Sequence, residues 1–382
     1  MRIPRLATRL AILSGLLFAC RAQSAAGDQS AVQTQAFETA LSGLNSATAT
    51  PPPAPTEIPT ATVPRTPPAL PAVYASSLLN PKDTPHTYVA DTCRYLKDKW
   101  DSTKSAPGTV AMIIMFHGIN KDAVTDPNDI SVADYRRMMD RLQAKGFEAI
   151  NATQLADFLD NNAKIPPLSV VLIADDRHYA EYFNDHFRPF YDQWGWPVIN
   201  GWISLEDGIR NLVLAENTAL SSEGWVDYQS HGYIHNIPMG DTSQPDFIRD
   251  EFELSISDLK TNFGKTPIAI IWPGGGFGAR PAQKAREYGY RVGFTTNPRG
   301  PVMFNWVPLA DQPDPQRPYF LAEGYVSDPR LTLPRYWPSQ VLPKVDDVRT
   351  MGEEAANYAT QNKAVELEYY DISCLGSYGP IP

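Results

Sequence analysis

The stretch Val170–Arg177, which reads VVLIADDR, decides the fold and the chemistry of this sequence. Its first five residues form a short apolar run, which predicts a β-strand. Two adjacent carboxylates, Asp175 and Asp176, follow that strand directly. Burying them at the end of an apolar strand is unfavourable unless a cation or hydrogen-bond donors compensate their charge. The stretch therefore indicates a charged functional site, the ordinary alternative being a turn and helix N-cap.

Runs of the same kind recur along the chain from about residue 76 onward. The expected strands are Val110–Phe116, Val170–Ala174, Pro197–Ile203, Trp225–Gln229, Ile268–Trp272 and Val292–Thr295. The amphipathic patterns between them predict helices at Asp134–Ala144, Thr153–Asn161, Ala180–Gln193, Arg249–Phe263 and Pro281–Tyr288. Strands that alternate with helices form a parallel sheet or barrel, so the pattern predicts the α/β fold class.

Polar residues follow several of these expected strands at the point where each strand ends. His117 follows the first strand, the two aspartates follow the second, Ser230-His231 the fourth and Pro273-Gly274 the fifth. Parallel α/β barrels build their active sites from the loops at the carboxyl ends of their strands. We therefore expect these separate segments to meet at one rim of the barrel.

The segment His231–His235, HGYIH, places two imidazoles four residues apart. If a helical turn begins there, both side chains lie on one face and can bind one metal ion. The motif alone is weak, because histidines of a core or a helix cap also occur at this spacing. One carboxylate of the aspartate pair adds a third ligand and leaves a position for water, as in catalytic zinc sites. The other aspartate is then free to act as a base.

Taken in order, these motifs resemble those of the polysaccharide deacetylases, the NodB-homology group of carbohydrate esterases. The resemblance covers roughly residues 111–336 and is carried by Val170–Arg177, His231–His235 and Ile268–Gly278. It implies an irregular (β/α) barrel of the NodB-homology type. It also implies a hydrolase that cleaves the C–N bond of acetamides with one divalent metal ion, zinc first and cobalt or nickel as alternatives.

The resemblance also implies a role for each residue of the site. Asp175 becomes the general base, which takes a proton from a water molecule that the metal has made more acidic. The implied metal ligands are Asp176, His231 and His235. The backbone N–H of Gly274, which follows Pro273, would stabilise the oxyanion of the tetrahedral intermediate.

Two positions near the base depart from the family pattern. Arg177 stands where glycine is usual, so it either narrows the entrance or adds a cation near the substrate. Trp272 stands where many members have an arginine that orients the base. Arg335 is the expected substitute, since its segment resembles the closing strand of one branch of the family, and a bidentate arginine would hold Asp175 ionised. The alternative for Arg335 is an ordinary surface salt bridge.

The general acid is the second gap in the pattern. The family's late histidine has no counterpart, because no histidine follows His235 in this chain. His117 is the remaining candidate, and its segment Met115–Gly118 looks like the opening of the branch that acts on exported poly-N-acetylglucosamine. His178 lies close to the aspartates in sequence, but a solvent-facing or supporting histidine is the ordinary interpretation.

The N-terminal residues predict export. Residues 1–20 combine arginines with the apolar run Leu10–Phe18, which is typical of a signal peptide and too short to span a bilayer. Leu17–Cys20 resembles a bacterial lipobox, which implies lipidation of Cys20, with a soluble secreted form as the alternative. Residues 21–75 are rich in Ala, Ser, Thr and Pro and predict a disordered linker. Residues 76–382 would then form the catalytic domain, outside the cytoplasmic membrane or secreted.

Two further features limit the partners and the covalent structure. The net charge of −10 opposes binding to nucleic acid, so we expect no such partner, and membrane contact only through the lipid anchor. In an oxidising compartment Cys93 and Cys374 could form a disulfide across the domain, and two separate thiols are the alternative.

The expected function is removal of N-acetyl groups from a cell-surface or extracellular polysaccharide. Poly-N-acetylglucosamine comes first, then peptidoglycan, then chitin-like oligomers. Tyr233, Phe277 and Trp337 are the aromatic residues expected in the groove, where they could stack on sugar rings. An O-acetyl esterase on the same fold and a catalytically impaired glycan-binding lipoprotein are the alternatives.

Overall fold

The computed structural model describes residues 65–121 and 124–382. The predicted signal peptide, the lipidation site Cys20 and most of the predicted linker therefore lie outside the described residues. The contacts of the chain divide it into Met1–Val63 and Pro64–Pro382, and only the second unit is considered below. Within the described residues, no helix is both long and apolar enough to cross a membrane.

A parallel sheet forms the centre of the domain, with strand order β10-β9-β8-β7-β6-β2. These strands are β2 (Val110–Phe116), β6 (Leu168–Asp175), β7 (Val198–Trp202), β8 (Val226–Ser230), β9 (Ala269–Ile271) and β10 (Val292–Phe294). The short β5 (Glu148–Ala149) pairs with the first half of β6. In β2 all seven residues are buried, because the strand is covered on both faces. The six predicted strands thus match these six strands, and each predicted end lies within two residues of the observed end.

A segment without regular structure links the two edges of this sheet. Leu333 forms a parallel bridge with Phe294 of β10, and Tyr336 forms one with Ile114 of β2. Pro334 lies between them and has no N–H to donate to a continuous ladder. Residues 333–336 therefore close the curled sheet into an irregular barrel, which confirms the predicted fold class.

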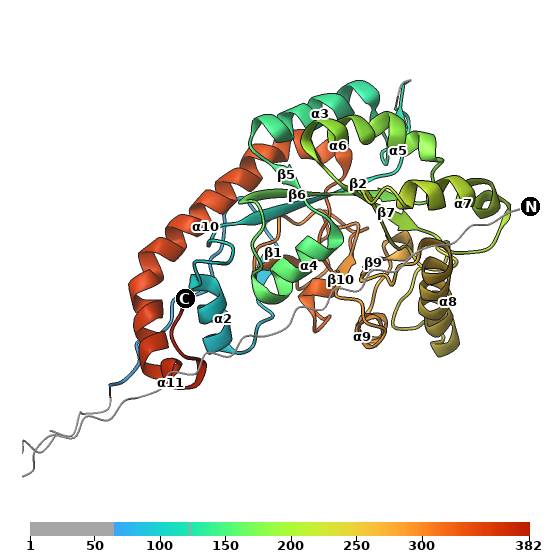
Figure 1. The fold of residues 1–382 in the computed structure, drawn as a ribbon. Coiled ribbons are helices and arrows are strands. Elements are labelled where there is room, and N and C mark those ends of the chain that lie inside the picture. The colour runs from blue at the N-terminus through green and yellow to red at the C-terminus, as the bar shows by residue number, and fades with distance from the viewer. Residues whose placement is uncertain (1–64, 122–123) are drawn as a thin grey trace, which may run out of the picture. The chain divides into compact units, whose positions relative to one another are not determined.

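Side chains on the strands alternate between two buried clusters. Val171 and Ile173 of β6 pack with Ala111, Ile113 and Ile199 inside the barrel. Their neighbours Val170 and Leu172 face outward onto the helices. Figure 1 shows α3 (Val132–Ala144), α6 (Arg188–Trp194) and the long α10 (Pro338–Ser373) along this outer side. The period of two along each strand therefore produces one core inside the barrel and one beneath the helices.

Local signals explain where several helices begin and end. The Asn151 side chain accepts from the Gln154 N–H and Gln154 bonds back, forming a capping box at the start of α4 (Ala152–Asn161). Gly264 ends α8 (Pro245–Phe263) with a φ of 64°, a left-handed conformation that favours glycine. The helix predicted at Ala180–Gln193 is instead two helices, α5 (Ala180–His186) and α6, which meet at Phe187 just before Arg188-Pro189.

Several elements were not expected from the sequence. The unpredicted helices are α2 (Thr92–Trp100), α7 (Gly208–Ser221), α10 and the short α11 (Leu375–Tyr378), while α9 (Ala279–Glu287) matches the helix predicted near it. Strand β1 (Asp83–His86) pairs antiparallel with β11 (Val307–Ala310), and β3 (Ile119–Asn120) pairs with β4 (Ile130–Ser131). Two 3₁₀ turns, η1 (Pro273–Gly275) and η2 (Pro329–Leu331), complete the described elements.

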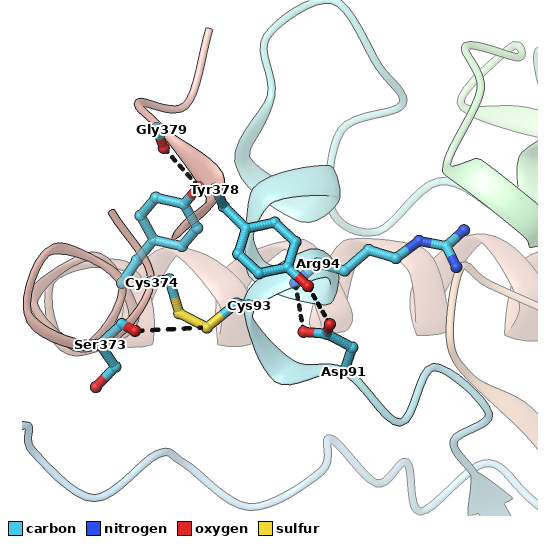
Figure 2. Close-up of a disulfide and its surroundings, with 8 residues drawn as sticks. Asp91, Cys93, Arg94, Ser373, Cys374, Tyr378 and Gly379 are labelled. Carbon is cyan, nitrogen blue, oxygen red and sulfur yellow. Dashed lines mark hydrogen bonds between the residues drawn. A yellow bond between two sulfur atoms is a disulfide. The ribbon is translucent and has the colours of Figure 1, made fainter. Parts of the chain in front are cut away.

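The two ends of the domain are joined covalently. Figure 2 shows the disulfide between Cys93 on α2 and Cys374 at the end of α10, with a Cα–Cα distance of 5.3 Å. The Tyr378 hydroxyl donates to Asp91, which also caps α2 through the Arg94 N–H. The bond closes a loop of 281 residues, and long loops gain the most from such a constraint on the unfolded chain.

Residues 65–75, the described end of the predicted linker, contact the domain. The Tyr358 hydroxyl on α10 donates to the carbonyl of Ala72, and the Tyr74 hydroxyl donates to Glu354. Arg65 also pairs with Asp371 near the end of the same helix. These hydrogen bonds hold residues 65–75 against α10, although their composition resembles that of the preceding linker.

Candidate active site

The predicted site residues meet at the carboxyl ends of the barrel strands. Asp175 is the last residue of β6, His117 follows β2 and His231 follows β8. The turn η1, which begins with Pro273, follows β9, and residues 333–336 bring Arg335 to the same end from the barrel closure. The sheet register therefore explains why residues so far apart in sequence lie together.

Asp175 is a buried carboxylate that is already paired. It is 1% exposed, and Arg335, which is 0% exposed, donates from Nη1 to its Oδ1 at 2.6 Å. The Nε of Arg335 donates to the carbonyl of Thr295 at 2.6 Å, which fixes the guanidinium. Burial alone would raise the pKa of Asp175, but the positive charge of Arg335 and the nearby His231 and His117 lower it to about 2. Asp175 is therefore ionised at neutral pH.

Trp272 stands at the position where an arginine was expected. The direction of its side chain shows why an arginine there would not reach Asp175. Its indole packs among Ile270, Phe252 and Tyr290 on the outer side of the sheet, and its Nε1 donates to the carbonyl of Leu331. A side chain at this position points away from Asp175. Arg335 reaches Asp175 from the barrel closure instead, through one hydrogen bond rather than the expected bidentate pair. Its full burial excludes the alternative of a surface salt bridge.

Asp176 faces a different environment from its neighbour. Its backbone has a φ of 70°, which turns its carboxylate toward two imidazoles. The Oδ1 atom lies 3.3 Å from Nε2 of His235 and 3.6 Å from Nε2 of His231. This Oδ1 is buried and has no hydrogen-bond partner among the described residues. One ligand atom from each of the three residues lies within 4.8 Å of the others, so the trio fits one metal ion.

A backbone carbonyl fixes the orientation of His231. Its Nδ1 lies 2.8 Å from the oxygen of Ile271, and because a carbonyl only accepts, Nδ1 carries the proton. The Nε2 lone pair is therefore free toward Asp176. Burial lowers the pKa of His231 to about 4, the nearby carboxylates opposing this shift only in part. The imidazole is thus neutral at pH 7, the form that binds metals.

The helical turn considered for His231–His235 is wrong. The segment is a loop in which Gly232 has a φ of 77° and His235 a φ of 67°. Its shape is held by Glu251 of α8, whose carboxylate accepts from the N–H groups of Tyr233 and Ile234. The two imidazoles still meet, with ring centroids 4.4 Å apart.

His117 lies beside the base. Its Nε2 is 3.6 Å from Oδ2 of Asp175, the oxygen that Arg335 leaves free. The ring stacks on the indole of Trp337 with centroids 6.3 Å apart, and Trp337 is fixed by a hydrogen bond to the carbonyl of Thr296. A quarter of the His117 side chain is exposed, so a substrate group can reach it.

Arg177 does not present a free cation to the site. Its guanidinium makes two hydrogen bonds to Asp207, at 2.7 and 2.9 Å, and a third to the carbonyl of Leu205. Its charge is therefore compensated, and the expectation of an additional cation near the substrate does not hold. His178 is part of the support beneath the aspartates, because its Nε2 bonds to the Asp175 carbonyl and its ring stacks on Tyr182.

The remaining predicted residues fall in different places. Gly274 has a φ of 56° in the turn η1, whose hydrogen bonds use the N–H groups of Gly275 and Gly276. Tyr233 and Trp337 are half-buried. Phe277 is buried in a hydrophobic cluster with residues of α8 and α9, so its expected position in the groove is wrong. Its apolar ring is better shielded from water there than at the rim.

Comparison with known proteins shows a similarity over part of the chain. Residues 202–293 match the family model described as polysaccharide deacetylase, a range that contains the HGYIH loop and the turn after β9 but not the aspartates or Arg335. No curated protein matches the chain.

Solved structures of deacetylases are also similar to this chain. Deacetylase PplD from Streptococcus pyogenes, in complex with acetate, has 19% identity, covers 63% of this chain and 99% of its own, and has a TM-score of 0.47. IcaB from Ammonifex degensii has 16% identity, coverage of 64% and 98%, and a TM-score of 0.46. The deacetylase domain of BpsB from Bordetella bronchiseptica has 16% identity, coverage of 60% and 95%, and a TM-score of 0.42. Over residues 202–293, the chain is similar to the polysaccharide deacetylases.

Proposed function

We propose that this protein is a metal-dependent enzyme that removes N-acetyl groups from a cell-surface or extracellular polysaccharide. The observation that carries the proposal is the division of the aspartate pair. Asp175 is ionised and held by Arg335, while Asp176 lies with His231 and His235 and has an oxygen without a partner. A base next to a three-ligand site is the arrangement that metal-assisted hydrolysis requires.

Asp175 is the general base of the proposed reaction. When bound, the divalent ion makes a water molecule more acidic and polarises the acetamide carbonyl. Asp175 accepts the proton of this water through Oδ2, because Oδ1 already accepts from Arg335. Its low pKa keeps the carboxylate in the form that can accept a proton at neutral pH.

His117 and Gly274 complete the reaction. As the C–N bond breaks, the leaving nitrogen needs a proton. His117 is the proposed donor, supported by the distance of 3.6 Å between its Nε2 and Oδ2 of Asp175. The N–H of Gly274 is free of the hydrogen bonds of its own turn and would donate to the oxyanion. The products are acetate and a free amine on the sugar.

The metal and the glycan are proposed on chemical grounds. A carboxylate with two imidazoles accommodates several divalent ions, and zinc is our first choice, with cobalt or nickel as alternatives. Poly-N-acetylglucosamine is the first substrate to test, because Met115–Gly118 resembles the segment of the branch that acts on it. A substrate outside the cell agrees with the predicted signal peptide and lipobox at the N-terminus. We therefore propose a lipoprotein anchored outside the cytoplasmic membrane, or a secreted form.

The proposal is tested with the full chain on four polymers, after chelation and after zinc addition. The panel contains poly-N-acetylglucosamine, peptidoglycan, chitin oligomers and O-acetylated xylan, and both free amine and acetate are measured. We expect free amine from an N-acetylated polymer only with metal present. Acetate from xylan without free amine would instead indicate an O-acetyl esterase, and no product from any polymer would indicate a glycan-binding protein.

A further inference from the structure

Glu251 is a buried carboxylate beside the proposed metal ligands that the reaction does not use. It is 1% exposed and belongs to α8. Its Oε2 accepts from the N–H of Tyr233 at 2.7 Å, and its Oε1 accepts from the N–H of Ile234 at 2.8 Å. Both carboxylate oxygens therefore hold the short loop that separates His231 from His235.

The loop fits closely against this carboxylate. Gly232 has a φ of 77°, and a Cβ atom added there would lie 2.6 Å from Oε2 of Glu251 and 2.5 Å from Cγ of Pro273. Only glycine fits this space in this conformation. Glu251 and Pro273 thus allow the backbone of this loop a single conformation. In that conformation both imidazoles point toward Asp176.

The charge of Glu251 has no cation to match it. None of the ion pairs among the described residues includes Glu251, and its hydrogen bonds come from neutral backbone groups. The charge of Asp175 is matched by Arg335. Asp176 and Glu251 therefore both lie at the site without a Lys or Arg partner among the described residues, and a divalent ion would compensate such carboxylates.

We propose that Glu251 is a positioning residue that sets the metal affinity of this site. It seats the loop between the two histidines through both of its carboxylate oxygens. The inference rests on the proposed function, because it assumes that Asp176, His231 and His235 bind the ion. Replacing a residue that orients metal ligands without binding the metal itself typically lowers the metal affinity by about 10-fold to 100-fold.

The test compares Glu251→Gln with Glu253→Gln. The glutamine at position 251 keeps the shape, removes the charge and replaces one acceptor with a donor that faces an N–H group. Glu253 lies on the exposed side of the same helix and accepts from the Tyr288 hydroxyl, so it is the matched control. Zinc affinity is measured by competition with a chelator of known affinity, and circular dichroism reports folding.

We expect zinc affinity to fall by about 10-fold to 100-fold in Glu251→Gln and to stay unchanged in Glu253→Gln. Activity of Glu251→Gln should recover substantially at saturating zinc, since the base is untouched. A folded Glu251→Gln protein with wild-type affinity would overturn the inference, and a lower melting temperature alone would show a purely structural role. If the wild-type chain binds no zinc, cobalt or nickel, the proposed function itself fails.

A second variant covers the case in which Glu251→Gln does not fold. Glu251→Asp keeps the charge but withdraws the oxygens by one methylene group. We expect its zinc affinity to lie clearly below that of the wild type. Wild-type affinity in Glu251→Asp would then contradict the seating of the loop by Glu251.

Discussion

Asp175 and Asp176 are neighbours in the chain, but they lie in opposite electrostatic environments. On the Asp175 side, the carboxylate is buried, ionised and bonded to Arg335 at 2.6 Å. The Asp176 side is open, because its Oδ1 has no hydrogen-bond partner and faces two imidazoles at 3.3 and 3.6 Å. The difference fits our proposal that protein charges hold Asp175 as the base and that a cation completes the Asp176 side.

The Asp175 side also extends deeper into the protein. The backbone N–H of Arg335 donates to the carbonyl of Asn297, whose side chain donates to the buried Glu323. Glu323 pairs with Arg299, and Arg299 pairs with Asp83. This series of buried hydrogen bonds fixes the segment that carries the arginine. The predictions below test how far the two sides differ.

Removing the base should have the largest effect. In Asp175→Asn the side chain keeps its shape but loses the ability to accept a proton from water at neutral pH. We expect kcat to fall on the order of 10³-fold, within the range of general base catalysis. Steady-state release of free amine from zinc-saturated protein measures this loss, and a decrease of less than about tenfold would exclude Asp175 as the base.

Removing the partner of the base should mainly affect stability. Arg335→Met leaves Asp175 buried without a partner, and such a change lowers the free energy of unfolding by about 3–5 kcal/mol. Urea unfolding measures it. Arg249→Met is the control, because its pairs with Asp246 and Asp250 are exposed and should contribute at most about 1 kcal/mol. Equal effects of the two substitutions would contradict the special position of Arg335.

Metal should stabilise the protein through the Asp176 side. At a zinc concentration about 100 times Kd, binding to the folded state raises the free energy of unfolding by about 2.7 kcal/mol. His235→Asn should abolish most of this gain, since it removes one of three ligands. Urea unfolding with and without zinc gives both values, and an undiminished gain in His235→Asn would place the ion elsewhere.

Acid should weaken the metal-free protein through Asp175. The pKa of Asp175 is lowered to about 2 in the folded state, so its contribution to stability is complete above about pH 4 and is lost as the pH falls toward 2. The loss amounts to about 2 kcal/mol. Asp175→Asn lacks this contribution, so its stability should fall less over the same range. Parallel pH profiles of the two proteins would contradict the low pKa.

The pair between Arg177 and Asp207 should have the smallest effect. It lies near the aspartates, but Asp207 is partly exposed and water screens the interaction. A double-mutant cycle of Arg177→Met and Asp207→Asn should give a coupling energy of about 1 kcal/mol or less. We expect kcat to change no more than a few-fold. A loss comparable to that of Asp175→Asn would mean that Arg177 contacts the substrate.

The sequence was informative where apolar periodicity and strand ends determine the structure. The run Val110–Phe116 predicts β2 with its observed bounds, and the polar residues after the strands do meet at one rim. Arg335 followed from resemblance, because the closing segment around Pro334 lacks the regular pattern of a strand. Helix α10 was missed, since its 36 residues include Pro343 and carry no sustained amphipathic period.

Other features depend on contacts that sequence reasoning does not reveal. Glu251 lies between Asp250 and Glu253 in a helix with many charges, and its burial depends on the loop that it holds. One signal was present, because at helical spacing it falls on the face of the buried Ile248, Ser255 and Leu259. The loop conformation of HGYIH was equally hidden, since Gly232 and His235 take positive φ values only in this setting.

Zinc binding by variants of the two neighbouring aspartates tests most directly whether Asp175 is the base and Asp176 a metal ligand. Asp175→Asn and Asp176→Asn are purified side by side, stripped of metal and titrated with zinc against a competing chelator. The division predicts that Asp175→Asn still binds one ion per chain with an affinity within about tenfold of the wild type, and that Asp176→Asn binds it at least about 100-fold more weakly. Equal affinities in the two variants, or a greater loss in Asp175→Asn, would contradict it.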